Sequence, residues 1–256
     1  MSGPLAGRVA LVTGAGQGVG RGIALALASA GAAVVVAARR AETGEPVAAE
    51  IRDRGVEGVC VETDVSRRDD VEGAVAATVA QLGGLDIVVH NAFSGRASTP
   101  HRLADVDEEL WTEFSQTAMW ASLHCARAAL PHLAGTGRGR LIILTSPAGI
   151  EGSAAVPLYA AVKGAQRALA KSLAREWGPL AVTVNCLAPL AVSPALDRAL
   201  VENPNLRPAL EARTPLGRLG DPEHDIGSIA AFLAGDGAGY ITGQTIVCNG
   251  GSFTGL

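Results

Sequence analysis

Three side chains, Ser146, Tyr159 and Lys163, have the types and the spacing needed to move a proton to or from an oxygen atom. Tyr159 and Lys163 are four residues apart, so on a helix they lie on one face, one turn apart. Ser146 ends an apolar stretch, and at the end of a strand its hydroxyl could hold a substrate oxygen on which charge grows. These residues are the candidate catalytic set.

The chemistry of this set depends on the pKa of the Tyr159 hydroxyl. A free tyrosine has a pKa of about 10, which is too high for proton exchange near neutrality. A cation about 4 Å away, at an effective dielectric constant of about 20, contributes about 4 kcal/mol, or roughly three pKa units. We therefore expect Lys163, if it stays charged, to bring the pKa of Tyr159 to about 7. The spacing alone is also compatible with an exposed lysine beside a half-buried tyrosine.

A glycine-rich turn near the start of the chain predicts a dinucleotide site. An apolar strand over residues 9–12 is followed by TGAGQGVG and by a helix that runs to about residue 30. Glycines let the backbone turn sharply and approach a pyrophosphate at the helix N-terminus. The candidates in this turn are Gly14, Gln17, Gly18, Val19 and Gly20. A glycine-rich turn without a ligand is the alternative.

The end of the second strand, over residues 33–37, indicates which dinucleotide binds. In folds of this kind an acidic residue at this place hydrogen-bonds a free ribose 2′-hydroxyl, and an arginine accommodates a 2′-phosphate. The chain has Ala38-Arg39-Arg40 there, so Arg39 could pair with a phosphate. We therefore expect NADP(H) to be preferred, with NAD(H) possible, although Gln17 is neutral. A solvated arginine pair that opens a helix is the alternative.

The remaining pattern predicts an α/β fold: one doubly wound Rossmann-type domain over residues 1–256, with seven parallel strands and helices on both faces. Asp64-Val65 ends the third strand, where Asp64 either accepts from an adenine amine or only caps the strand end. Ser66-x-x-Asp69 and Asp105-x-x-Glu108 resemble capping boxes, and Asp221-Pro222 begins the last helix. The other strands are expected at 59–63, 85–90, near 141–146, 182–187 and 245–248.

A proline-punctuated stretch from 190 to 220 differs from the rest of the chain. A long connection in a compact domain is usually a binding loop or a lid, so we expect it to cover the substrate. Its residues and their neighbours supply several apolar or small candidates for the substrate pocket. These hint at an apolar substrate, a carbonyl compound or an alcohol, without identifying it. The pocket candidates are Phe93, Pro147, Ala148, Glu151, Gly152, Leu190, Val192 and Leu196.

Composition excludes several classes of protein. With 48% apolar residues among 256, the chain is not disordered, and a net charge of −4 without a basic block argues against nucleic acid. The four cysteines are far apart in apolar runs, which predicts reduced core thiols and no metal site. The uncharged segment 22–38 is slightly short for a membrane span. Without a leader sequence, the expected location is the cytoplasm.

Taken together, these motifs resemble the short-chain dehydrogenase/reductase family over essentially the whole chain. The resemblance implies that Tyr159 is the general acid/base of a ketone–alcohol interconversion, that Lys163 lowers its pKa and holds the nicotinamide ribose, and that Ser146 orients the substrate oxygen. It also implies a homotetramer or homodimer packed through helices at about 108–132 and 155–177. The matching motifs are Thr13-Gly14-x-x-x-Gly18-x-Gly20, Asp64-Val65, Asn91-Ala92, Ser146, Tyr159-x-x-x-Lys163, Asn185 with Pro189, and the terminal Ile241-Thr242-Gly243-Gln244 and Gly250-Gly251.

The expected cofactor-binding set follows from the turn, the strand ends and this resemblance. It comprises Gly14, Gln17, Gly18, Val19, Gly20, Arg39, Asp64, Val65, Asn91, Ala92, Tyr159, Lys163, Pro189 and Val192.

The chain departs from the family's pattern at several site positions. Phe93 stands where the family usually has glycine. Leu190, directly after Pro189, also replaces a glycine, and Ser193 replaces a threonine. Ala118 replaces the fourth catalytic residue, an asparagine that supports a water leading protons to the lysine, partly through its backbone carbonyl. We expect a slower proton relay or lost activity. The alternative function is therefore a dinucleotide-binding protein with little or no catalysis, and His90 is expected to hydrogen-bond backbone.

Overall fold

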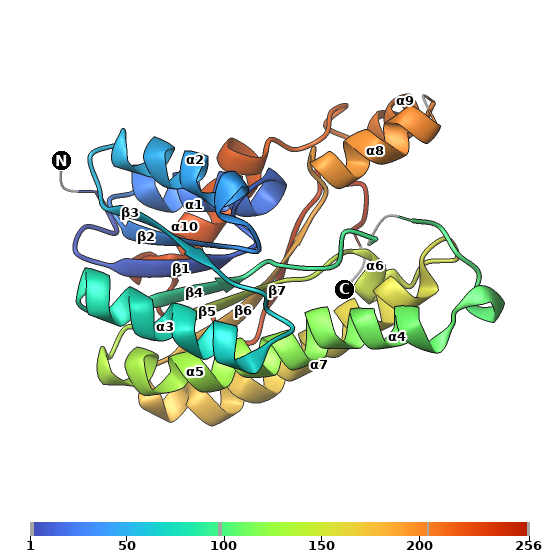
Figure 1. Cartoon of the computed structure of the whole chain (residues 1–256). Helices are drawn as coiled ribbons and strands as arrows, with labels where there is room; N and C mark the ends of the chain where they lie inside the picture. Colours follow the sequence, from blue (N-terminus) through green and yellow to red (C-terminus); the bar gives the residue numbers. More distant parts are fainter. Residues whose placement is uncertain (1–2, 97–98, 204, 255–256) are drawn as a thin grey trace.

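A seven-stranded parallel sheet forms the centre of the molecule (Figure 1). The computed structural model describes residues 3–96, 99–203 and 205–254. The strand order is β3-β2-β1-β4-β5-β6-β7, which confirms the doubly wound prediction. The strands are β1 (Val9–Thr13), β2 (Ala33–Ala38), β3 (Gly58–Glu62), β4 (Ile87–His90), β5 (Arg140–Leu144), β6 (Thr183–Pro189) and β7 (Thr245–Cys248).

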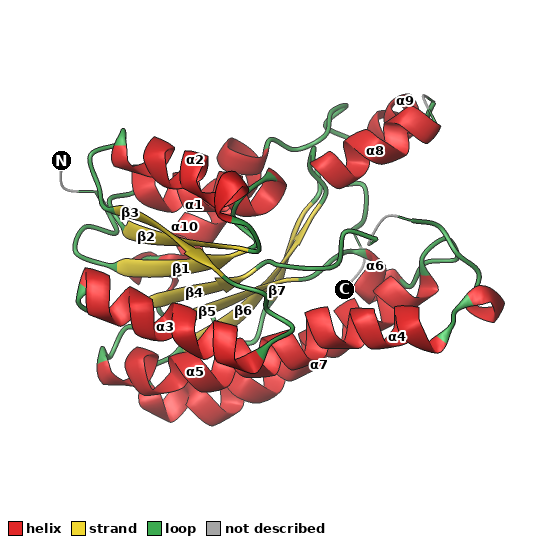
Figure 2. Ribbon diagram, viewed as in Figure 1, coloured by secondary structure: helices red, strands yellow, loops and turns green. Residues whose placement is uncertain are grey.

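Helices cover both faces of this sheet, which is why the central strands are apolar at almost every position rather than at alternate ones (Figure 2). One face carries α1 (Gly18–Ser29), α2 (Ala41–Arg52) and α10 (Ser228–Ala234). The other carries α3 (Arg68–Leu82), α5 (Ala121–Gly135) and α7 (Pro157–Trp177).

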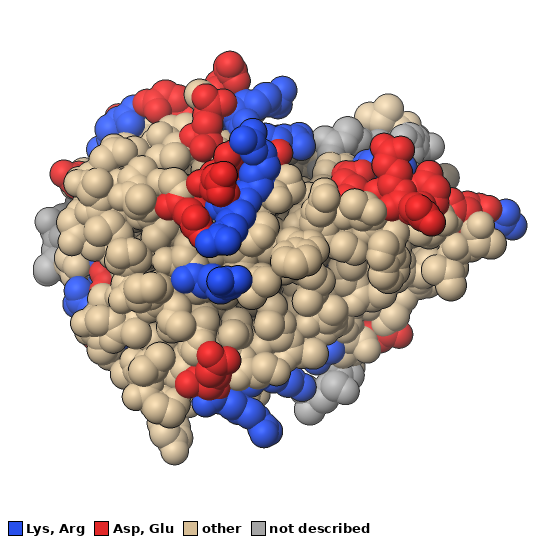
Figure 3. All heavy atoms as spheres, turned by 60° about the horizontal axis from the view of Figure 1, so that its bottom comes forward, with Lys and Arg blue, Asp and Glu red and all other residues tan. Residues whose placement is uncertain are grey.

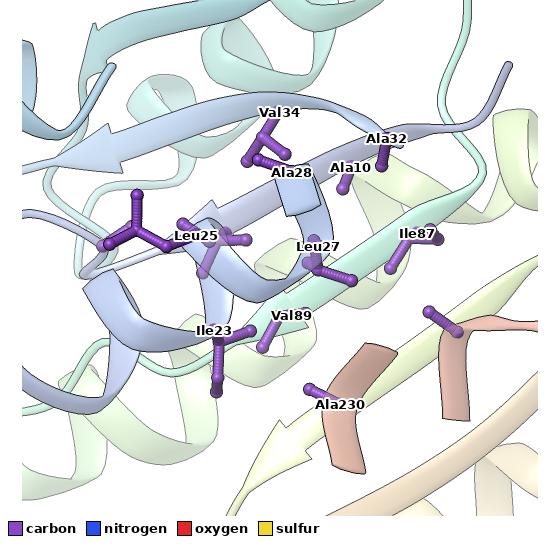
Figure 4. Packing of buried hydrophobic residues seen from close by; sticks show 14 of the residues in the cluster. Ala10, Ile23, Leu25, Leu27, Ala28, Ala32, Val34, Ile87, Val89 and Ala230 are labelled. Atoms are coloured by element: carbon purple, nitrogen blue, oxygen red, sulfur yellow. The ribbon is translucent and has the colours of Figure 1, made fainter. Parts of the chain in front are cut away.

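Each face has its own hydrophobic cluster. On the α1 face, small and branched side chains interdigitate between the helix and the sheet (Figure 4). This packing fixes α1 against the strands and so fixes the turn that leads into it. The residues that Figure 4 labels are Ala10, Ile23, Leu25, Leu27, Ala28, Ala32, Val34, Ile87, Val89 and Ala230.

Short elements gather beyond the carboxyl ends of the strands. They are η1 (Leu103–Asp105), α4 (Glu108–Ser115), the π-helical turn η2 (Gln116–Trp120), α6 (Ala148–Glu151), α8 (Pro194–Glu202) and α9 (Leu206–Ala212). Three further turns, η3 (Gly178–Leu180), the π-helical η4 (Pro222–Gly227) and η5 (Asp236–Ala238), connect the later elements.

Two predicted helix starts are wrong and one is confirmed. Ser66 does not cap α3; its hydroxyl instead donates to Asp64 Oδ1 at 2.6 Å, so it belongs to the strand end. The cap of α4 is Asp107 rather than Asp105, with its carboxylate accepting from Leu110 N at 2.7 Å. Asp221 begins η4 as expected. Both errors arise because a capping pattern can occur beside the true helix start.

The segment 190–220 is not the extended loop that its prolines suggested, because α8 and α9 occupy most of it. In Figure 1 these helices project beyond the sheet, opposite α4 and α6. Pro194 is the first residue of α8, a position where a missing N–H costs nothing. That the segment acts as a lid stays a prediction.

The uncharged segment 22–38 contains most of α1 followed by β2, as expected. Among the described residues no helix combines the length and the apolar character that crossing a membrane requires. The four cysteines are free thiols, and the described part of the chain brings together no group of metal-ligating side chains.

Candidate functional site

The site lies where the strand order reverses, beyond the paired ends of β1 and β4. A polar ladder joins these ends. Asn91 Nδ2 donates to the carbonyls of Thr13 (3.0 Å) and Gly14 (3.1 Å). The Thr13 hydroxyl accepts from the backbone N–H groups of Asn91 and Ala92, each at 3.1 Å. These hydrogen bonds fix the glycine turn at the edge of the sheet. Asn91 and Ala92 therefore stabilise a turn that is distant from them in the sequence.

Close approach explains the glycines of this turn. Gly14 has φ +65°, and a Cβ there would lie 2.8 Å from the Ala92 Cα. At Gly20 a Cβ would lie 2.4 Å from both Asn91 Nδ2 and Gly14 O. Only glycine fits either place. The first turn of α1 contains no acidic residue, so its free N–H groups can face an anion.

A cavity of about 540 Å³ extends from this turn along the sheet edge. Its size is that of a ligand site. It brings together most of the predicted cofactor-binding residues, namely Gly14, Gln17, Gly18, Val19, Gly20, Arg39, Asp64, Val65, Asn91 and Ala92. Val192 lines an adjoining cavity of about 230 Å³, whereas Tyr159, Lys163 and Pro189 are not among the residues that line either one.

Asp64 caps the end of β3, which is one of the two roles that its position in the sequence left open. Its Oδ1 accepts from the backbone N of Ser66 at 3.0 Å as well as from the hydroxyl, so it is a strand-end cap. It nevertheless lines the cavity. These hydrogen bonds hold the Asp64 carboxylate at the cavity wall. Its contact with an adenine amine stays a prediction.

The three candidate catalytic residues do meet. Ser146 follows β5, Tyr159 lies in the first turn of α7, and their hydroxyls are hydrogen-bonded. The Lys163 Nζ lies 5.7 Å from the centroid of the Tyr159 ring. The loop between β5 and α7 therefore brings together residues that are thirteen positions apart in the sequence.

Lys163 is almost completely buried, with 3% of its surface exposed. Its ammonium donates to the Leu144 carbonyl at 2.7 Å and to Gln166 Oε1 at 3.0 Å, both of them uncharged acceptors. Burial without an anionic partner disfavours the charged form and lowers the pKa of Lys163 to about 7. At neutral pH this lysine is close to the midpoint of its titration.

The expected lowering of the tyrosine pKa is not what the structure gives. Burial raises the pKa of the Tyr159 hydroxyl, and the hydrogen bond from Ser146 opposes that rise only in part. The ammonium does not counteract the burial because it points at Leu144 and Gln166, and because it is itself only partly charged near neutrality. The sequence-based estimate assumed a fully charged lysine aimed at the phenol.

Phe93 explains the separation between the cavity and the lysine. Its ring lines the cavity, and the Lys163 Nζ lies 4.6 Å from the ring centroid. The ring also packs edge-on against Tyr159 (5.2 Å between centroids) and Phe114 (5.1 Å). The departure from glycine thus places an apolar wall against the candidate catalytic residues, as expected, and contributes to the burial of the ammonium.

The backbone hydrogen bond expected of His90 is made to Ala118 rather than at the strand end. Its Nδ1 faces the Thr13 hydroxyl at 3.2 Å. Burial, assisted by the nearby charge of Lys163, lowers the pKa of His90 to about 3. The imidazole is therefore neutral under ordinary conditions and acts as a packing group.

Sequence reasoning missed Gln166 and Ser122, which join the lysine to Ala118. A signal was present: Gln166 is a polar residue on the same helical face as Val162, Ala170 and Ala174, which are apolar and buried. A polar side chain on such a stripe needs a specific partner.

Comparison with known proteins gives a consistent picture. The profile of a family described as enoyl-(acyl carrier protein) reductase matches residues 14–252. The chain is similar to the 3-oxoacyl-(acyl-carrier-protein) reductase FabG of Pseudomonas aeruginosa, with 38% identity over 97% of this chain and 98% of the relative. It is also 35% identical to dehydrogenase/reductase SDR family member 4 of Bos taurus, over 99% of this chain and 90% of the relative.

Two solved structures share the fold. One is described as a short-chain alcohol dehydrogenase from Sinorhizobium meliloti, with a TM-score of 0.91, 35% identity, and 97% of each chain covered. The other is a 3-ketoacyl-(acyl-carrier-protein) reductase from Brucella melitensis complexed with NADH. Its TM-score is 0.89 and its identity 31%, over 97% of this chain and 99% of that one.

Titration of the tyrosines tests the electrostatics of the site. The chain has two, and Tyr240 is fully exposed. Because burial raises the pKa of Tyr159, we expect ultraviolet titration of the folded protein to show an ionisation above the ordinary value of about 10. Tyr159→Phe should remove that step, and Tyr240→Phe is the control that keeps it. If Tyr159→Phe instead removes a step well below the ordinary value, the lysine dominates and our assignment is wrong.

Proposed function

Because this chain belongs to the short-chain dehydrogenase/reductase family, we propose that it interconverts a ketone and a secondary alcohol by hydride transfer, with NADP(H) preferred. The family makes the chain an oxidoreductase that acts on CH–OH or C=O groups with a nicotinamide cofactor. The observation that carries the finer proposal is the hydrogen-bonded pair of Ser146 and Tyr159 beside the cavity wall. The cofactor, when bound, supplies or accepts the hydride.

Each member of the set has a role in this proposal. Ser146 holds the substrate oxygen, and Tyr159 gives a proton to the alkoxide that forms in reduction or removes one from the alcohol in oxidation. The raised pKa keeps Tyr159 protonated at neutral pH, so the resting residue can act as the proton donor in reduction. Lys163 lies one turn from Tyr159 on the same helix and supplies the cation of the site when it is protonated.

The names of the relatives suggest a substrate class. Two of them, from Pseudomonas aeruginosa and Brucella melitensis, are reductases of a 3-oxoacyl or 3-ketoacyl group on an acyl carrier protein. A 3-oxoacyl thioester has a ketone as the reacting group and an apolar chain beside it. The Phe93 ring, which lines the cavity and packs on the buried Phe114, supplies an apolar wall that suits such a chain. We therefore propose 3-oxoacyl thioesters as the first class to test.

Replacing the phenol tests the assignment of the acid/base. In Tyr159→Phe we expect turnover of the best ketone in a panel to fall by about 10²- to 10⁴-fold, because the proton donor is lost. The affinity for the cofactor, measured by fluorescence titration, should change little. Tyr240→Phe, at an exposed position, is the matched control. Undiminished turnover in Tyr159→Phe would refute the role of Tyr159.

The alternative, a dinucleotide-binding protein with weak or no catalysis, is supported by Phe93 and Ala118. Phe93 separates the cavity from Lys163, and Ala118 offers no side-chain amide. Tight binding of cofactor without turnover of any compound in the panel, unchanged by Ala118→Asn, would favour this alternative over the enzyme.

The preference for NADP(H) is supported by two exposed arginines at the end of β2. Arg39 and Arg40 both line the cavity, and within the described residues neither one forms an ion pair. No acidic side chain lines this end of the cavity close to them except Asp64, which caps its own strand.

Arginine removal tests this preference. A hydrogen bond to a charged group is worth about 1.5–3 kcal/mol, so Arg39→Leu should weaken NADPH binding by roughly 10- to 150-fold. The affinity for NADH should stay nearly constant, because the 2′-phosphate is absent. Arg102→Leu, which removes an exposed arginine away from the cavity, controls for net charge. Equal effects on both cofactors would contradict the proposal.

The predicted homo-oligomer is supported by an apolar surface. Trp111 of α4 and Trp120 of η2 are more than half exposed, at 53% and 55%. The side of the molecule that carries α5 and α7 shows large areas without charged side chains in Figure 3. Exposed aromatic residues of this kind mark interfaces. We propose that copies of the chain associate through the helices at 108–132 and 155–177.

An interface substitution tests the association. A glutamate at the centre of an apolar contact cannot be paired or hydrated there, so Trp120→Glu should shift the solution mass toward a smaller species. Light scattering after size-exclusion chromatography measures this. Leu103→Glu, at an exposed leucine in η1, is the control expected to keep the wild-type mass. An unchanged oligomer in Trp120→Glu would place the interface elsewhere.

A further inference from the structure

A buried amide lies next to the candidate catalytic lysine. Gln166 follows Lys163 by three residues on α7 and is 0% exposed. A buried amide costs free energy unless its polar atoms are hydrogen-bonded, and both ends of Gln166 are. Its Oε1 accepts from Lys163 Nζ at 3.0 Å. Its Nε2 donates to Ser122 Oγ at 2.9 Å and to the Ala118 carbonyl at 3.3 Å.

The chemistry of the partners fixes the orientation of this amide. An ammonium has only donors and a carbonyl only accepts, so the oxygen must face Lys163 and the nitrogen must face Ala118. Ser122 completes the arrangement, because its hydroxyl accepts from Gln166 and donates to the Ala118 carbonyl at 2.7 Å. A flipped amide would place donor against donor at one end and acceptor against acceptor at the other.

The Ala118 carbonyl lies in an irregular stretch of helix, where it also accepts from the Ala121 backbone N–H. Ala118 lies in η2, a π-helical turn between α4 and α5. Such turns interrupt the regular helical ladder and occur often at functional sites. Ala118 is also the position at which the resemblance to the family leads one to expect an asparagine. Its methyl group is fully buried, so the amide at this place comes from the facing helix instead.

We propose that Gln166 is the positioning residue of Lys163: from α7 it holds the ammonium and links it to the Ala118 carbonyl, supplying the carboxamide that position 118 lacks. This inference rests on the proposed function, because Gln166 matters for catalysis only if the reaction uses Lys163. Gln166 touches neither the reacting hydroxyls nor the cavity, so it acts only through Lys163.

No other described group takes over this contact. The titratable groups that face Lys163 are Tyr159 on its own helix, His90 from β4 and Cys186 from β6, with Cys125 of α5 behind His90. His90 is neutral, and burial raises the pKa of the Cys186 thiol to about 12. Without Gln166, the ammonium would keep the Leu144 carbonyl as its hydrogen-bond acceptor and would be harder to keep charged.

The composition of the chain permits a direct test. The protein contains two lysines, Lys163 and Lys171, so carbon-13-labelled lysine gives two side-chain signals, which Lys171→Arg assigns. In the wild type we expect Lys163 to titrate at about 7. In Gln166→Leu the midpoint should fall by about one to two pH units, the value of one hydrogen bond to a charged group. In Gln166→Glu, an anionic acceptor should raise it above the wild-type value.

A matched control separates positioning from stability. Thr78→Val removes another buried hydrogen bond, between Thr78 Oγ1 and the Ala74 carbonyl in α3, away from the site. Thermal unfolding should show a loss of stability in both Thr78→Val and Gln166→Leu. The Lys163 midpoint should move only in the Gln166 variants. If Gln166→Leu does not fold, the rise in Gln166→Glu alone carries the test.

A Lys163 midpoint that stays at the wild-type value in the Gln166 variant that folds would overturn the proposal. The proposal would also be overturned if Thr78→Val shifted the Lys163 midpoint as much as the Gln166 variants do. The titration needs neither substrate nor turnover, so it can succeed while the proposed reaction fails, and it can fail while Tyr159 still proves to be the proton donor. The two ideas are therefore tested separately.

Discussion

The site depends on one unusual constraint, a lysine ammonium buried among uncharged groups. Lys163 has a backbone carbonyl, an amide oxygen and an aromatic ring around its Nζ, and no carboxylate of the described residues pairs with it. Hydrogen bonds to neutral acceptors replace only part of the hydration that the charge loses. The free energy difference between charged and neutral lysine is therefore small near neutral pH, and each of the surrounding groups can shift it.

The sheet provides the rigid support for this arrangement. Leu144 is the last residue of β5, and Thr13 and His90 end the neighbouring strands in register. The carboxyl ends of parallel strands meet at one edge, so side chains from distant parts of the sequence converge there. The hydrogen bonds of Asn91 extend this order into the glycine turn. The cavity and the catalytic candidates thus rest on the same strand ends.

The departures at Phe93 and Ala118 are connected through the lysine. Phe93 covers Nζ from the side of the cavity, and Gln166 reaches Nζ from the interior. The Gln166 amide donates to the Ala118 carbonyl in the π-helical turn, and the Ser122 hydroxyl donates to the same carbonyl. These residues are best understood as one rearranged set of contacts around a common group rather than as independent losses from the family pattern.

Much of the fold could be predicted from the sequence because its signals are local. Apolar runs such as 33–37 and 245–248 gave the strands to within about two residues, and the glycine turn indicated the cofactor end of the site. Two kinds of prediction were wrong. The prolines of 190–220 suggested a loop where α8 and α9 form, and the capping residue of α4 is Asp107.

The sequence by itself determined that Ser146, Tyr159 and Lys163 could meet, because strand ends and helical spacing place residues without knowledge of their surroundings. Only the tertiary structure decided the protonation energetics of these groups. A pKa depends on burial and on where a charge points, and for Lys163 both are set by side chains from β4, β5 and α7 and the loops between them. No spacing rule contains that information.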